Sequence, residues 1–136
     1  MATKPPIVID LAWSGQLEFA ATLSKTTFVV DSNGSAGPSP VEMLGAALAG
    51  CMSMDLAYIL TRGQHQFTAL RSRLIGERSP DVPHRFTSVT LHFDIAGPVP
   101  RDAVARAVQL SREKYCSVWH SMRQDIDLQV TFALTP

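Results

Sequence analysis

Residues 39–62 read SPVEMLGAALAGCMSMDLAYILTR, and this stretch decides the fold. Ser39 and Glu42 have the spacing of a capping box, and Pro40 suits the first helical position because its missing N–H has no partner to lose there. Gly63 then ends the pattern. We therefore expect one long helix, roughly 33 Å in length at about 1.5 Å per residue.

The first two thirds of this predicted helix is apolar on nearly every face. No charged residue lies between positions 43 and 54, and positions 45–50 hold only Gly, Ala and one Leu. A helix that is apolar all round must be covered by other elements. The small residues indicate that a neighbour approaches the backbone closely.

Alternation of apolar and other residues predicts strands on both sides of the helix. The expected strands are 7–14, 17–23 and 26–30 before it, and 67–75, 88–95 and 126–134 after it, with 88–95 central. Turn-forming residues predict loops at 31–40 and 76–85. Helical spacing predicts a second helix over 101–115, which packs through one face formed by Val104, Ala107, Val108, Ser111 and Tyr115, and a short third helix over 117–123. The order is that of an α+β fold: a three-stranded meander, a long central helix, two strands, a second helix and a C-terminal strand.

A chain of 136 residues with 46% apolar composition suits a single domain, 1–136. One small meander is not large enough to cover the central helix on every side. We therefore predict that a second copy of the chain supplies part of the cover, as an intertwined homodimer.

Twelve basic and twelve acidic residues balance, which gives no field that favours nucleic acid or an anionic membrane surface. Asp10 and Ser14 interrupt any apolar segment of signal-peptide length near the N-terminus, and Glu42, Asp55 and Arg62 argue against a membrane span. We expect a cytoplasmic protein. In a reducing compartment its two cysteines are more often free or redox-active than a permanent disulfide.

Those cysteines, Cys51 in the middle of the long helix and Cys116 far downstream, are the sharpest candidates for chemistry. Cys116 precedes a predicted helix start, where exposed N–H groups favour a thiolate. Two interpretations stay open, a redox pair or two small side chains that fill the core. Asp55 lies one turn after Cys51, and we expect it to bind a backbone group or an arginine such as Arg71 or Arg73.

Neither a metal nor a cofactor is predicted. The four histidines have no metal-ligand spacing with one another or with the cysteines. The chain also has no glycine-rich phosphate loop, no serine-centred nucleophile elbow and no basic aromatic platform. Nucleotide, hydrolase and RNA-binding functions therefore have no support.

Two motifs resemble the OsmC/Ohr family, and in particular its YhfA-like branch. One is GPSPVEML at 37–44, continued by AGC at 49–51, and the other is EKYCSV at 113–118; the resemblance covers almost the whole chain. It implies an intertwined homodimeric α+β fold with two active sites at the interface, and the reduction of organic hydroperoxides. On this pattern Cys51 is the peroxidatic nucleophile, Cys116 the resolving thiol, and a dithiol such as a lipoyl group the reductant.

The chain departs from the peroxidase branches of that family at two points. Those branches carry Glu directly after the proline of the helix start, whereas Val41 holds that place here and Glu42 follows about 100° further round the helix. They also carry an Arg in the N-terminal strands, and this chain has no Arg before Arg62. Glu42 thus keeps two interpretations, a capping residue or a catalytic carboxylate that orients an active-site group.

Two functions follow. The first is a thiol-dependent peroxidase that acts on an organic, apolar hydroperoxide in a pocket lined by Met43, Met52 and Met54. The alternative is an OsmC-like stress or small-ligand-binding protein without efficient peroxidase activity, in which the same pocket holds a small apolar ligand. The departures favour the second function and the retained thiols favour the first.

Overall fold

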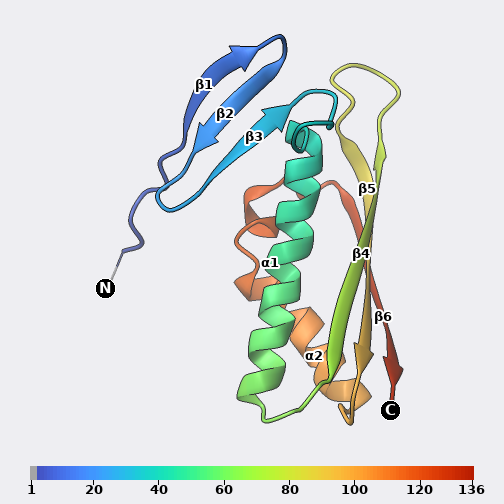
Figure 1. Cartoon of the computed structure of the whole chain (residues 1–136). Helices are drawn as coiled ribbons and strands as arrows, with labels where there is room; N and C mark the ends of the chain where they lie inside the picture. Colours follow the sequence, from blue (N-terminus) through green and yellow to red (C-terminus); the bar gives the residue numbers. More distant parts are fainter. Residues whose placement is uncertain (1–2) are drawn as a thin grey trace. The chain divides into compact units, whose positions relative to one another are not determined.

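A computed structural model describes residues 3–136, and Figure 1 shows the course of the chain. The chain divides into two compact units, one that ends at Leu44 and one that runs from Gly45 to Pro136. The predicted α+β order is observed, with a three-stranded sheet before the long helix and a mixed sheet after it.

The first unit contains an antiparallel meander. Its strands are β1 (Asp10–Gly15), β2 (Glu18–Thr22) and β3 (Thr27–Asp31), paired in the order β1-β2-β3. β1 begins three residues later than the predicted strand over 7–14. Residues 7–9 are apolar but pair with no neighbouring strand.

The loop after β3 is ordered around one carboxylate. Asp31 is only 4% exposed, and its side chain accepts backbone N–H bonds from Asn33, Ser35 and Ala36 at 3.0 to 3.2 Å. These bonds, with that from Ala36 the strongest, lower the pKa of Asp31. The predicted loop at 31–40 is therefore an ordered turn, held by Asp31, that leads into the helix.

The long helix α1 (Pro40–Arg62) starts with the predicted capping box. The Ser39 N–H donates to Glu42 Oε1 at 3.0 Å, and the Glu42 N–H donates to Ser39 Oγ at 3.3 Å. The bond from the Ser39 N–H is the main cause of a lowered pKa of Glu42. The two bonds satisfy backbone donors that a helix start would otherwise leave free, and they fix where α1 begins.

The second unit is a helical layer on one face of a three-stranded sheet. β4 (Ala69–Arg78) is antiparallel to β5 (Phe86–Ala96), which is parallel to β6 (Asp127–Thr135), so β5 is central as predicted. The helical elements are the main part of α1, α2 (Arg101–Leu110), η1 (Ser111–Tyr115) and η2 (Trp119–Ser121).

The core of this unit joins one stripe of α1 to alternate residues of β5. The α1 stripe repeats every four residues, and the facing β5 residues repeat every two, as one covered face of a sheet requires. These buried residues are Leu48, Met52, Leu56 and Leu60 of α1, Val89, Leu91, Phe93 and Ile95 of β5, and Val104 and Ala107 of α2.

One predicted loop is partly strand. We expected residues 76–85 to be a loop, but β4 continues to Arg78 and pairs Gly76 with Val89. The ring of Phe86 lies over Gly76, where a Cβ would come within 2.8 Å of Phe86 Cδ1. Gly76 therefore leaves space for the ring of Phe86 in the core. In the sequence, a glycine that is needed for such packing inside a strand cannot be distinguished from one that marks a turn.

By length and composition α1 is also apolar enough to cross a membrane. A mostly buried core helix of a soluble protein meets the same criterion, so it is weak evidence of a membrane span; in α1, 28% of the apolar window is buried in the described chain.

Candidate thiol site

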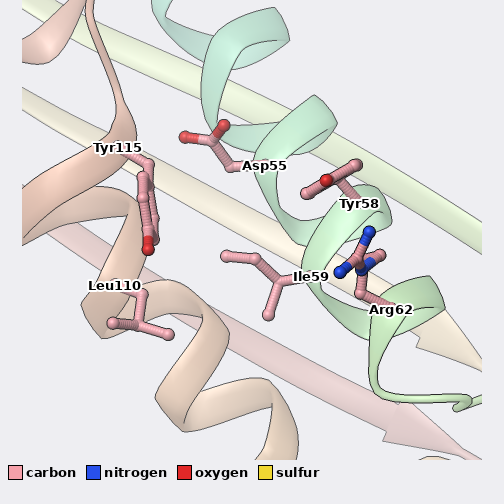
Figure 2. A pocket seen from close by; sticks show the side chains of 6 residues that line it. All are labelled: Asp55, Tyr58, Ile59, Arg62, Leu110 and Tyr115. Carbon is pink, nitrogen blue, oxygen red and sulfur yellow. The ribbon is translucent and has the colours of Figure 1, made fainter. Parts of the chain in front are cut away.

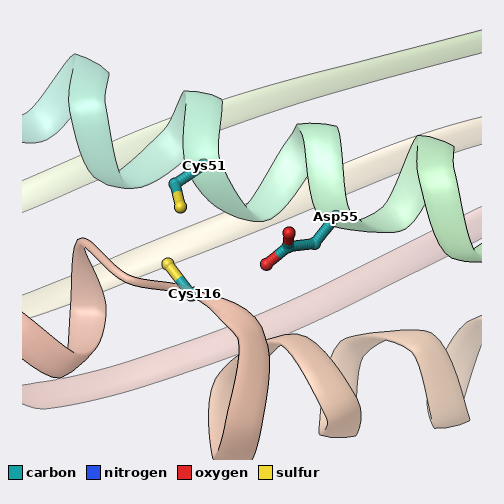
Figure 3. Close-up of side chains that lie close together, drawn as sticks. All are labelled: Cys51, Asp55 and Cys116. Carbon is teal, nitrogen blue, oxygen red and sulfur yellow. The ribbon is translucent and has the colours of Figure 1, made fainter. Parts of the chain in front are cut away.

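Two sulfur atoms from distant parts of the sequence meet in the second unit. The Sγ atoms of Cys51 and Cys116 and a carboxylate oxygen of Asp55 all lie within 4.8 Å of one another (Figure 3). Both cysteines are free. The expectation that the two sulfur atoms come together is confirmed.

Helix α1 supplies two members of this group. Cys51 and Asp55 are four residues apart, a spacing that stacks side chains on one face of a helix. Figure 3 shows both side chains directed toward the segment that carries Cys116.

The third member, Cys116, directly follows a π-helical turn. α2 ends at Leu110, and η1 continues it as a wider turn in which the Cys116 N–H donates to the Ser111 carbonyl at 2.8 Å. Single π turns inside α-helices are frequent at functional sites. The predicted regular helix over 101–115, with Tyr115 on its buried face, is therefore wrong in its last turn, because the wider turn leaves Tyr115 49% exposed.

Asp55 has a different partner from those expected. Ser111 Oγ donates to Asp55 Oδ2 at 2.7 Å, whereas Arg71 and Arg73 make no salt bridge with it. Within residues 3–136, no salt bridge involves Asp55. The carboxylate therefore lies beside two thiols with a hydroxyl donor and without a paired cation.

The two thiols differ in exposure. Cys116 is completely buried, and this burial is the main reason why the pKa of its thiol is raised from 9.0 to about 11. The Trp119 N–H, which donates to Cys116 Sγ at 3.3 Å, lowers that pKa, while Cys51 and Asp55 raise it further. The expectation of a Cys116 thiolate is wrong because desolvation outweighs one N–H donor. Cys51 is only partly buried, so it is the sulfur that a reagent reaches first.

A pocket of about 560 Å³ adjoins this group (Figure 2). Asp55 belongs both to the pocket wall and to the thiol group. The other lining residues are Tyr58, Ile59 and Arg62 of α1, Leu110 at the end of α2, and Tyr115 of η1.

This wall is not the methionine-lined one expected from sequence. Met52 is fully buried in the core and Met54 is 73% exposed; none of Met43, Met52 and Met54 lines the pocket. The sequence does hold a signal for the observed wall, because Asp55, Ile59 and Arg62 follow one another at helical spacing from Cys51. Because this face mixes charged and apolar residues, its pattern alone does not predict a pocket wall.

Glu42 belongs to the first unit. Its carboxylate and backbone N–H make the two capping bonds with Ser39. The capping interpretation is confirmed, and a catalytic role for Glu42 stays a prediction.

Comparison with protein-family profiles matches residues 32–131 to the family described as OsmC-like protein. The match includes both cysteine motifs and most of the chain. The chain belongs to the OsmC-like family. Among curated relatives, Protein YhfA of Escherichia coli strain K12 is 44% identical over 92 residues, which are 66% of this chain and 69% of YhfA.

Solved structures support the same fold for this OsmC-like chain. A hypothetical protein from Aquifex aeolicus VF5 superposes with a TM-score of 0.90 at 23% identity, covering 97% of this chain and 98% of that one. An organic hydroperoxide resistance protein from Elizabethkingia anophelis gives a TM-score of 0.70 at 17% identity, covering 99% and 100%. At these identities the likeness concerns the fold.

Proposed function

We propose that the protein is a thiol-dependent peroxidase that reduces organic hydroperoxides through Cys51 and Cys116. The observation that carries this proposal is the approach of the two free sulfur atoms, one partly exposed and one buried. Membership of the OsmC-like family, whose fold is shared by proteins named for organic hydroperoxide resistance, supports the same chemistry.

In the first step the Cys51 thiolate attacks the outer oxygen of the hydroperoxide. The O–O bond breaks, the sulfur becomes a sulfenic acid, and the alkoxide takes a proton and leaves as an alcohol. Cys51 fits the role of nucleophile because it is the more accessible of the two thiols.

In the second step the Cys116 sulfur attacks the Cys51 sulfenic acid. An S–S bond forms, and the sulfenic oxygen leaves as water with the Cys116 proton. A dithiol such as a lipoyl group then exchanges with the Cys51–Cys116 disulfide, which restores both thiols and leaves the dithiol as its own disulfide.

The pocket supports an organic rather than an inorganic peroxide. Its wall joins apolar and aromatic surface, from Ile59, Leu110 and Tyr115, to the carboxylate that lies beside both thiols. Such a wall suits an apolar tail whose peroxide end reaches Cys51.

We further propose that the chain acts as a single cytoplasmic domain that assembles into an intertwined homodimer. Large apolar side chains that are exposed together mark interaction sites more often than free surface, and the first unit exposes many of them. Among the described residues, the large exposed apolar side chains of the first unit are Ile7, Val8, Ile9, Leu11, Trp13, Leu17, Phe19 and Leu44. A Cβ on Gly50, beside Cys51, would meet nothing within 4 Å in the described chain, which leaves space for a partner there.

A binding or stress-response function without efficient peroxidase activity is the second candidate. Two observations favour it: the Glu42 carboxylate is engaged by the Ser39 N–H, and no Arg precedes Arg62 in the sequence. In this case the pocket beside Asp55 would hold a small apolar ligand that is not consumed.

A thiol count separates the two candidates. Reduced protein is mixed with cumene hydroperoxide, and free thiols are titrated over time after the peroxide has been removed. The peroxidase proposal expects the loss of two thiols per chain within seconds and no peroxide consumption by Cys51→Ser. Thiols that survive an excess of peroxide for an hour would reject it in favour of the binding function.

A further inference from the structure

We propose that Cys51, Asp55 and Cys116 together form a binding site for one thiophilic divalent cation, of the class of Zn²⁺ or Cd²⁺. This inference goes beyond the peroxidase proposal and does not need peroxide chemistry to be correct. It differs from the sequence-based expectation of no metal, because one of the three ligands is an aspartate whose position beside Cys116 is set by the fold.

The three donor atoms have suitable chemistry and separation. Thiolate sulfur and carboxylate oxygen are both zinc ligands, with bond lengths of about 2.3 Å and about 2.1 Å. Tetrahedral angles at such lengths place two sulfur ligands roughly 3.8 Å apart. The observed donors all lie within 4.8 Å of one another, so small side-chain rotations bring them to a common centre.

Two of these ligands are already oriented by neighbouring groups. Ser111 Oγ donates to Asp55 Oδ2 at 2.7 Å, which leaves Oδ1 free to bind, and the Trp119 N–H donates to Cys116 Sγ at 3.3 Å. Hydrogen bonds of this kind fix the direction of ligating side chains in metal sites. The π turn brings the Ser111 hydroxyl to Asp55 of α1, and Cys116, which follows the turn, points toward α1 in Figure 3.

Charge also favours a cation. Once both thiols have lost their protons, two thiolates and one carboxylate carry three negative charges, and no salt bridge of the described residues 3–136 supplies a compensating charge to Asp55. A divalent ion reduces the net charge of the group to −1 while the two thiol protons pass to solvent.

Three protein ligands leave a fourth coordination position for water or another small ligand, so the site is open rather than closed. A metal-bound sulfur cannot at the same time take part in an S–S bond. Metal binding and formation of a Cys51–Cys116 disulfide therefore exclude each other.

The test is titration of reduced, metal-free protein with Cd²⁺ at pH 7, followed by the ultraviolet thiolate-to-cadmium charge-transfer band. We expect one Cd²⁺ per chain, loss of the band in Cys51→Ser and in Cys116→Ser, and at least tenfold weaker binding in Asp55→Asn. His92→Ala is the matched control, because His92 and Asp94 form an exposed pair that lies outside the thiol group. This control should bind as the wild type does.

Binding that persists in either serine variant, that is unchanged in Asp55→Asn, or that is lost in His92→Ala overturns the proposed site. Because Cys116→Ser puts a hydroxyl into a buried position, zinc-edge X-ray absorption of the wild-type protein gives an independent measurement. Two sulfur ligands support the site, and one or none contradicts it. The thiol count with cumene hydroperoxide on metal-free protein keeps the two proposals separate, since cadmium binding by thiols that resist peroxide rejects only the peroxidase.

Discussion

Ser111 Oγ donates a 2.7 Å hydrogen bond to Asp55 Oδ2, across 56 positions of the sequence. Ser111 is fully buried at the start of the π turn, and Asp55 lies one helical turn after Cys51. This bond therefore joins the two segments that carry the two sulfur atoms.

Removing this hydroxyl should affect both stability and oxidation. We expect Ser111→Ala to lower the free energy of unfolding by about 2 kcal/mol, because a partly buried carboxylate loses its donor. We also expect slower formation of the Cys51–Cys116 disulfide, since the π turn that precedes Cys116 loses its hydrogen bond to Asp55 of α1. Chemical denaturation and a timed thiol count measure the two effects.

Ser72→Ala is the matched control for this prediction. Ser72 shares a 3.0 Å hydroxyl bond with Ser53, but this bond is exposed. Its loss should change the free energy of unfolding by less than about 0.5 kcal/mol. Equal effects of the two substitutions would contradict a special role for the Ser111–Asp55 bond.

Removing Cys116, the proposed resolving thiol, should trap the first oxidised intermediate. With Cys116→Ser we expect cumene hydroperoxide to leave a sulfenic acid on Cys51, because no second sulfur is present to displace the oxygen as water. A dimedone-type reagent followed by mass spectrometry detects this species. A label of equal amount in the wild-type protein would mean that Cys116 does not resolve the intermediate.

Sequence reasoning was reliable where a local rule decides the structure. The Ser39–Glu42 capping box and the start and end of α1 follow from side chains within one turn, and the central place of β5 follows from its alternation. The resemblance to the family, through the two cysteine motifs, also predicted correctly that Cys51 and Cys116 lie close together.

The parts that were missed depend on contacts between distant residues. A π turn differs from an α turn by one residue, so the apolar period of α2 does not reveal it, and the burial of Tyr115 was predicted wrongly. We expected Asp55 to bind a backbone group or an arginine, because the sequence does not show that Ser111 comes within reach. The raised pKa of Cys116 has the same origin, since burial is a property of the packed unit.

Gly76 gives a test of packing in the sheet. We expect Gly76→Ala to lower the free energy of unfolding by about 1 to 3 kcal/mol, because the added Cβ meets the Phe86 ring. Thermal or chemical unfolding measures this loss. Gly45→Ala is the comparison, since a Cβ there would lie 3.6 Å from Leu74 Cδ2, an ordinary contact; a loss as large at Gly45 would reject the explanation.

The proposed homodimer predicts a specific sensitivity of the first unit. Wild-type protein should run as a dimer in light scattering at micromolar concentration, and Trp13→Glu, at an exposed apolar position of β1, should weaken it at least tenfold. The control is Val82→Glu, because Val82 is 85% exposed in the loop between β4 and β5. A stable wild-type monomer, or equal weakening by both substitutions, would contradict this interface.

The raised pKa of Cys116 predicts how stability depends on pH. The folded protein holds the thiol proton with a pKa of about 11, against 9.0 for an unperturbed cysteine, so folding favours the protonated form. The stability linked to this proton is fully present below pH 9 and is lost as the pH rises from 9 to 11. The loss amounts to roughly 3 kcal/mol, because the pKa values of the thiol in the folded and unfolded chain differ by about two.

Other groups also titrate in this alkaline range, and comparison with Cys116→Ala removes their contribution. We expect the difference in free energy of unfolding between wild type and Cys116→Ala, measured with urea under reducing conditions, to be constant from pH 7 to pH 8.5. It should then shift against the wild type between pH 9 and pH 11, because only the wild type buries a group whose ionisation opposes folding. A difference that stays constant up to pH 11 would show that the Cys116 thiol ionises in the folded protein as easily as in the unfolded chain.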